Sequence, residues 1–218
     1  MRNFELFQDY RFDNFVLNHG LLWQQISDSL LTCAADCVND RPCISFNFHQ
    51  GKRQCRAYET LMLTADAGTS KEDWTYFYIT RGNCPFPYAY SRTFNYCLGY
   101  EGHSDKEDGF SQCQGKGGRF LLIRTAEENR FASLLAYNFN HLSDPISRQM
   151  IVQGNFDFVD MTWKDDSGAN LTFTQFREGQ AIPESESALF IKHTNNPTNF
   201  MMTSRKGNKN PSIVVCII

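Results

Sequence analysis

The stretch CQGKGGRFLLIRTAEENRFASLL, from Cys113 to Leu135, decides the fold of the second half of this chain. Its glycines can hardly continue a helix, so a helix that contains Cys113 must end there. The apolar run from Phe120 to Ile123 predicts a short buried strand. Thr125 and Glu128 then form a capping box that begins a second helix. The expected order is helix, glycine turn, strand and capped helix.

Residues outside this stretch extend the pattern. They are Ile151 to Gly154 (IVQG), Trp163 in MTWKDDSGA, Phe176 at the end of FTQF, Pro183, and Cys216 in the closing VVCII. The whole pattern resembles the C-type lectin-like domain, in which a cysteine of the first helix is bonded to one in the last strand. The resemblance implies a bridge from Cys113 to Cys216. In the chain-entropy model, a bridge that closes so long a loop stabilises the fold by roughly 4 to 5 kcal/mol.

A helix with two cysteines on one side is expected near the start of the chain. Ser27 or Asp28 can cap this helix, and the spacing of Cys33 and Cys37 places both on one face. Alternating apolar and polar residues then predict a strand from Ile44 to His49. Similar patterns predict strands within residues 4–26, 55–58 and 74–80, whereas residues 61–73 are polar and irregular.

This succession, with CISFNF and QCRAYE after the helix, resembles the PAN or apple domain over residues 4–82. The resemblance implies bridges from Cys33 to Cys55 and from Cys37 to Cys43. Many apple domains have a third bridge between their two ends, but no cysteine precedes Cys33 here. The segment CPFPYAYSRTFNYC resembles the N-terminal hairpin of long-form C-type lectin-like domains, which implies that Cys84 is bonded to Cys97.

We therefore expect an α+β chain of two disulfide-stabilised domains. Residues 1–82 would form a PAN or apple domain, with an antiparallel sheet and one helix. Residues 83–218 would form a long-form C-type lectin-like domain, with two helices, two small antiparallel sheets and a long loop. Eight cysteines favour an oxidising environment, so we expect a secreted, extracellular protein whose export signal is not in this chain.

Composition narrows the classes of partner. The net charge of −3 and the isoelectric point near 5.9 give no broad attraction to nucleic acid or anionic membranes. No apolar segment is long enough to span a bilayer. The early cysteines lack the paired spacing of zinc knuckles, so a zinc site is not expected.

Two triplets decide whether the lectin-like domain should bind calcium. Sugar-binding members of the family hold the ion with a Glu-Pro-Asn or Gln-Pro-Asp triplet and a Trp-Asn-Asp triplet, because Ca²⁺ takes six to eight oxygen ligands. Here the corresponding residues are Ile182-Pro183-Glu184 and Phe200-Met201-Met202. We therefore expect no metal, no cofactor and no calcium-dependent sugar site. The carboxylates of Asp165, Asp166, Glu184 and Glu186 could rebuild a different site or be solvated loop charges.

The loop from about Asp165 to Asn199 remains the candidate binding surface. Its candidate ligand-binding residues are Phe176, Ile182, Pro183, Glu184, Glu186, Asn195, Asn196 and Asn199. Turn chemistry can explain each of them singly, whereas exposed apolar and amide groups together suit a partner. Asn170 begins the N-x-S/T sequon of this loop and is a possible glycosylation site.

No catalytic motif is present, and the histidines are scattered, so we expect no enzymatic activity and no catalytic residues. The resemblances imply an extracellular recognition or adhesion protein that binds a protein or glycan partner. One alternative is a calcium-dependent carbohydrate-binding lectin. Another is a structural component of an extracellular matrix or polymer, with self-association.

Overall fold

The computed structural model describes residues 4–142, 148–176, 187–192, 201–206 and 211–218. The chain divides into two compact units, Met1–Gly99 and Tyr100–Ile218. Both units combine helices with mainly antiparallel strands, so the chain is α+β, as the sequence predicted. All eight cysteines are bonded, Cys33 to Cys55, Cys37 to Cys43, Cys84 to Cys97 and Cys113 to Cys216.

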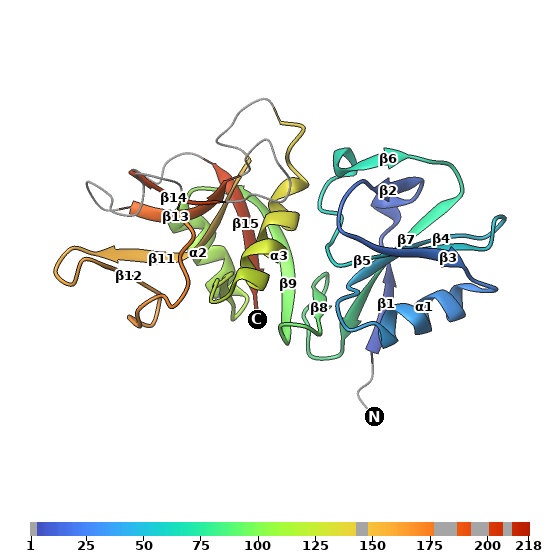
Figure 1. The fold of residues 1–218 in the computed structure, drawn as a ribbon, viewed down its shortest axis with the longest axis horizontal. Helices are drawn as coiled ribbons and strands as arrows, with labels where there is room; N and C mark the ends of the chain where they lie inside the picture. Colours follow the sequence, from blue (N-terminus) through green and yellow to red (C-terminus); the bar gives the residue numbers. More distant parts are fainter. Residues whose placement is uncertain (1–3, 143–147, 177–186, 193–200, 207–210) are drawn as a thin grey trace. The chain divides into compact units, whose positions relative to one another are not determined.

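A five-stranded antiparallel sheet forms the centre of the first unit (Figure 1). Its strands, in spatial order, are β1 (Phe4–Gln8), β7 (Trp74–Arg81), β4 (Ser45–His49), β5 (Gln54–Tyr58) and β3 (Leu21–Ile26). Two short strands, β2 (Phe15–Leu17) and β6 (Gly68–Ser70), pair with each other on the side of the sheet away from α1 (Figure 1). The 3₁₀ turns are η1 (Tyr10–Phe12) and η2 (Ala65–Ala67). The segment 61–73, predicted to be irregular, thus contributes one strand.

Helix α1 (Leu30–Asn39) packs on one face of this sheet through its cysteines. It begins after Ser29, whose Oγ accepts the N–H of Thr32 at 3.1 Å. The predicted caps were wrong, since Ser27 instead donates its hydroxyl to the carbonyl of Ser29. All four cysteines of this region are fully buried beside Phe46 and Phe77, whose rings stack at 5.1 Å. The two bridges therefore lie in the core.

The first unit ends with a hairpin of β8 (Ala89–Ser91) and the start of β9 (Tyr96–Ser104). The turn between them directs Arg92 at the C-terminal end of α1. Its guanidinium donates to the carbonyls of Cys37 (2.6 Å), Asp40 (2.5 Å) and Cys43 (2.7 Å), and also to that of Val38. Carbonyls in the last turn of a helix have no partner within it, so Arg92 supplies a donor to those of Cys37 and Val38 and also bonds the segment after the helix.

The second unit contains a larger sheet. Its strands, in spatial order, are β14 (Met201–Lys206), β13 (Ser187–Lys192), β11 (Gln149–Asp157), β15 (Ser212–Ile217) and β9, which continues from the first unit. Two short strands join it: β10 (Arg119–Phe120) pairs with β15, and β12 (Thr162–Lys164) pairs with β11. Met150 of β11 pairs with Ile213 of β15 in parallel, whereas the β10–β15, β11–β12, β11–β13 and β13–β14 pairs are antiparallel.

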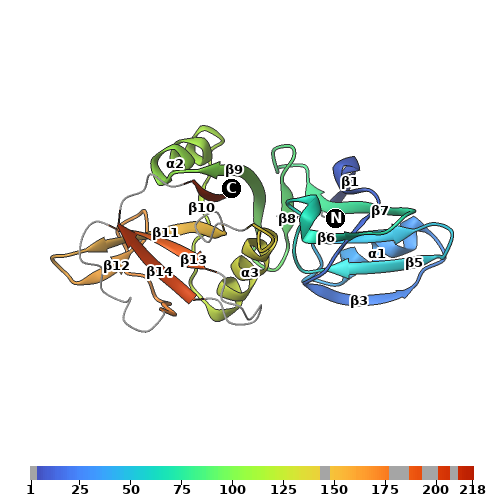
Figure 2. The same cartoon turned by 90° about the horizontal axis from the view of Figure 1, so that it is seen from above.

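Two helices cover different parts of this sheet (Figure 2). Helix α2 (Lys106–Gly115) contacts β10 and β15, and α3 (Ala126–Tyr137) contacts β11 and β13. The end of α2 needs glycine: Gly117 has φ +74°, and a Cβ on Gly118 would lie 2.6 Å from the carbonyl oxygen of Ile217. The N–H groups of both glycines bond back to α2, which is the Schellman arrangement. The glycine turn therefore brings the chain against β15.

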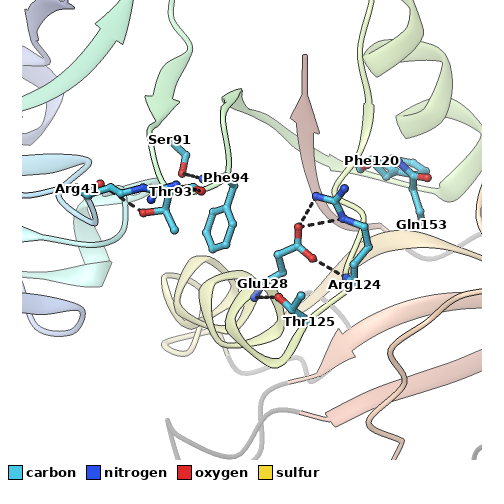
Figure 3. A network of polar contacts seen from close by, with 9 residues as sticks. All are labelled: Arg41, Ser91, Thr93, Phe94, Phe120, Arg124, Thr125, Glu128 and Gln153. Carbon is cyan, nitrogen blue, oxygen red and sulfur yellow. Dashed lines mark hydrogen bonds and ion pairs between the residues drawn. The ribbon is translucent and has the colours of Figure 1, made fainter.

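The polar groups before α3 differ from a simple capping box (Figure 3). Thr125 Oγ1 accepts the N–H of Glu128 at 3.1 Å, as the sequence predicted. The Glu128 carboxylate, however, accepts the backbone N–H of Arg124 at 2.6 Å and also its guanidinium. Because Glu128 is 3% exposed, this arrangement satisfies a buried carboxylate.

The predicted strand from Phe120 to Ile123 is shorter than expected. Only residues 119 and 120 pair with β15, although residues 121 to 123 are buried. Gln153 accounts for the difference, because its side chain donates to Phe120 O at 2.7 Å (Figure 3) and its backbone N–H to Leu121 O at 2.9 Å. The apolar run thus passes from a strand into an extended segment held by β11.

Candidate binding surface

The β11–β12 hairpin and the loop that follows it form the candidate surface of the second unit. Their base is an aromatic cluster in which the ring of Trp163, 6% exposed, lies 5.4 Å from that of Phe156 and 5.6 Å from that of Phe176. Phe158 contacts Phe156 edge to face at 5.0 Å. These contacts bury the apolar base of the hairpin and so fix the start of the loop.

The turn of the hairpin is organised by Asp157. One of its oxygens accepts the N–H groups of Val159 at 2.8 Å and Asp160 at 3.3 Å. The other accepts the ammonium of Lys164 at 2.5 Å, and Lys164 also pairs with Asp160. The pKa of Asp157 is lowered, first by the Lys164 hydrogen bond and then by the two backbone donors. The same carboxylates raise the pKa of Lys164.

Asp165, which the sequence suggested as a possible calcium ligand, accepts hydrogen bonds from residues of its own loop. A single oxygen of its carboxylate accepts the N–H of Ser167 at 2.8 Å, the hydroxyl of Ser167 at 2.6 Å and the N–H of Ala169 at 3.0 Å. These donors, the hydroxyl first, lower the pKa of Asp165. Asp166 is exposed and lies 3.5 Å from the amide nitrogen of Asn155. Among the described residues, no three His, Cys, Asp or Glu side chains are grouped to hold a metal ion.

Strand β14 carries part of the second triplet. Met202 is fully buried and pairs with Ile191 of β13, and its N–H donates to Gln175 O at 2.8 Å. Gln175 in turn accepts the amide of Asn129 on α3 at 3.1 Å. An apolar side chain therefore fills the core at the position that we predicted to match the acidic end of the sugar-binding triplet. Phe200 lies outside the described residues.

The structure places few of the predicted ligand-binding residues. Phe176 lies against Trp163 and is half-buried. The others, Ile182, Pro183, Glu184, Glu186, Asn195, Asn196 and Asn199, lie outside the described residues. Asn170 is exposed, and its side-chain oxygen accepts the hydroxyl of Thr162 at 3.3 Å.

Sequence reasoning missed the exposed end of the hairpin. The side chains of Phe158, Val159 and Met161 are 43%, 91% and 53% exposed. The sequence did contain a signal for it. The apolar residues of FVDM, at positions 158–161, interrupt the alternation of apolar and polar residues at a point where a polar turn is expected.

Comparison with known proteins places both parts of the chain. Residues 3–84 match the family model described as PAN domain. The crystal structure of CEL-IV covers 62% of this chain and 93% of its own, with 14% identity and a TM-score of 0.51. Residues 3–84 thus match the PAN domain, and the second part of the chain has the C-type lectin-like fold.

Other solved structures resemble the C-type lectin-like domain at similar identity. The Ca²⁺-independent C-type lectin SPL-2 from Saxidomus purpuratus is 14% identical, with 62% of this chain and 94% of that chain covered and a TM-score of 0.49. The C-type lectin CEL-I from Cucumaria echinata is 12% identical, with 62% and 97% covered and a TM-score of 0.47. A search of curated protein sequences found no match. Within the described part of the chain, no helix has the length and apolar character to cross a membrane.

Proposed function

We propose that this protein is a non-catalytic, extracellular recognition protein that binds a protein or glycan partner without calcium. PAN and C-type lectin-like domains are typically binding modules, and four disulfides suit secretion into an oxidising environment. The partner would contact the lectin-like loop, the PAN sheet, or both. The proposed domain boundary stays between residues 82 and 83, with the 84–97 hairpin counted by its pattern as lectin-like although it packs within the first compact unit.

The observation that carries calcium independence is the burial of Met202. A calcium site at this strand would need an oxygen where the side chain of Met202 is packed in the core, with 0% exposure. Asp165, a nearby loop carboxylate, already accepts three hydrogen bonds from residues 167 and 169. These bonds all reach one oxygen of Asp165, so that oxygen could bind an ion only at the cost of the turn that the bonds hold.

A calcium titration tests this proposal. We expect no heat in calorimetry and no rise of the melting temperature at millimolar calcium, because a ligand that binds the native state would raise it. A glycan array with and without chelator should give the same pattern. The matched variant is Asp165→Asn, which should lower the melting temperature equally with and without calcium. A calcium-dependent rise of the wild-type melting temperature that Asp165→Asn removes would contradict the proposal.

A further inference from the structure

The turn of the β11–β12 hairpin presents apolar side chains to solvent. We call residues 158–161 the hairpin tip. Val159 is 91% exposed, Met161 53% and Phe158 43%. In Figures 1 and 2 the β11–β12 hairpin extends away from the rest of the second unit, with this turn at its far end. Exposed apolar residues are common singly, but three within four residues on a protruding turn form a patch.

The hairpin tip is held in one conformation by its neighbours. The ladder pairs Phe156 with Trp163 and Asp157 with Thr162. Asp157 then accepts the N–H groups of residues 159 and 160, and Met161 has φ +54°. A left-handed backbone is unfavourable for methionine, so the surrounding bonds must stabilise it. The apolar groups are thus preorganised, which reduces the entropy lost on binding.

The charged side chains around the hairpin tip have a net negative charge. Asp157 and Asp160 share the single ammonium of Lys164, which leaves a net charge of −1. The side chain of Asp160 is 53% exposed and that of Lys164 only 21%, so an approaching molecule meets the carboxylate first. At the base of the hairpin, Asp165 and Asp166 are faced by Arg119 and Lys106. The tip therefore has an apolar centre with an acidic edge.

We propose that the hairpin tip is the anchor of a protein–protein interface, and that its partner has an apolar pocket with a basic rim. Apolar anchors at the centre and charges at the edge are the usual anatomy of a specific interface. The acidic edge disfavours anionic membranes, because insertion of the apolar residues would bring both aspartates to the lipid headgroups. It also disfavours a second copy of this chain docking tip to tip, since like charges would meet.

This surface lies before the loop from Asp165 to Asn199, so the inference stands or falls separately from the proposed function. The probe is a yeast-displayed library of one small scaffold protein, whose randomised surface is drawn equally from basic, acidic and apolar residues. The full chain is the target of selection. We expect enriched clones with basic and apolar randomised surfaces, whose affinity falls at higher salt.

Three variants of the full chain then test where these clones bind. Val159→Ser with Met161→Asn removes apolar groups, and asparagine tolerates the left-handed position 161; affinity should fall about tenfold or more. Asp160→Asn should weaken binding less and reduce its salt dependence. Leu31→Ser, at a side chain of α1 that is 77% exposed, is the control and should change nothing.

Three results would overturn the proposal. The first is selection of acidic surfaces, or of clones that bind the tip variant as well as the wild type. The second is binding to vesicles of phosphatidylcholine with phosphatidylserine that the tip variant loses, which would indicate a membrane. The third is a dimer in sedimentation that only the tip variant lacks, which would indicate a second copy.

Discussion

Two hairpins of this chain use their turns in opposite ways. The turn between β8 and β9 directs its polar groups at its own unit: Arg92 donates to carbonyls at the end of α1, and Thr93 donates to Arg41 O at 3.3 Å (Figure 3). The turn between β11 and β12 makes internal polar contacts through Asp157 and Asp160 and leaves Val159 91% exposed. The comparison indicates that the first turn stabilises the fold, whereas the second is available for contact.

The largest expected effect is a loss of folding stability on substitution at the base of the second hairpin, compared with substitution at its tip. Trp163→Ala removes a ring, 6% exposed, that packs against Phe156 and Phe176, and should lower the free energy of unfolding by about 3–5 kcal/mol. Phe158→Ala, at a half-exposed ring of the tip, should cost less than about 1.5 kcal/mol. Urea unfolding followed by circular dichroism measures both. Equal losses would mean that the tip is part of the core.

The next effect tests the structural role of the first hairpin. Arg92→Met keeps an apolar stem but removes the donors to the carbonyls of residues 37, 38, 40 and 43. We expect a loss of about 2 kcal/mol in the free energy of unfolding of the first unit, because solvent can replace only part of the charged hydrogen bonds. Thr93→Val, which removes one exposed hydrogen bond, is the control and should cost below about 0.5 kcal/mol.

The Arg92→Met variant also tests how the end of the first unit is held to its helix. Two of the carbonyls that Arg92 contacts belong to Cys37 and Cys43, which are bonded to each other. Many apple domains tie their two ends with a third bridge, and this chain has no cysteine before Cys33. Arg92 thus provides a noncovalent contact between the end of the first unit and its helix. An unchanged urea midpoint in Arg92→Met would contradict this role.

Sequence patterns predicted the parts of the fold that depend on local chemistry. The four bridges in the structure join the pairs that the two resemblances imply, and Thr125 caps α3 as its motif predicted. Local sequence patterns did not predict features that depend on residues far away in the sequence. Leu121 is held outside the strand ladder by the N–H of Gln153, and β6 exists because β2 lies beside it. Neither partner can be read from the neighbouring residues.

The candidate surface was harder to predict for a related reason. Phe156 and Phe158 have the same place in the strand alternation, yet Phe156 is 9% exposed and Phe158 is 43% exposed. The ladder ends at the pair of Asp157 and Thr162, and a register shift between Val152 and Asn155 precedes it. A period of two residues shows which side chains share a face, but not where pairing stops. The hairpin tip begins at that point.

The smallest expected effect concerns the acidic edge of the second hairpin. Asp157→Asn keeps an oxygen that can accept the N–H groups of Val159 and Asp160, but it removes the charge that pairs with Lys164. The pKa of Asp157 is lowered in the folded chain, so its contribution is fully present above the unfolded pKa, roughly 3.9. That contribution is lost as the pH falls through the folded pKa.

The variant should therefore be slightly less stable than the wild type at pH 7, and the difference should shrink as the pH falls below about 3.9. The pKa of Lys164 is raised, so a second loss should occur only in strongly alkaline solution, above the ordinary lysine value of about 10.4. Urea unfolding across this pH range measures the loss of stability in acid and the loss in alkali. The control is 1 M salt, because screening should reduce the stability difference between variant and wild type at pH 7. A difference that persists in acid would show that Asp157 acts through turn geometry rather than charge. The hairpin tip would then be ordered by hydrogen bonds alone. Lys164 would act through its ion pair with Asp160.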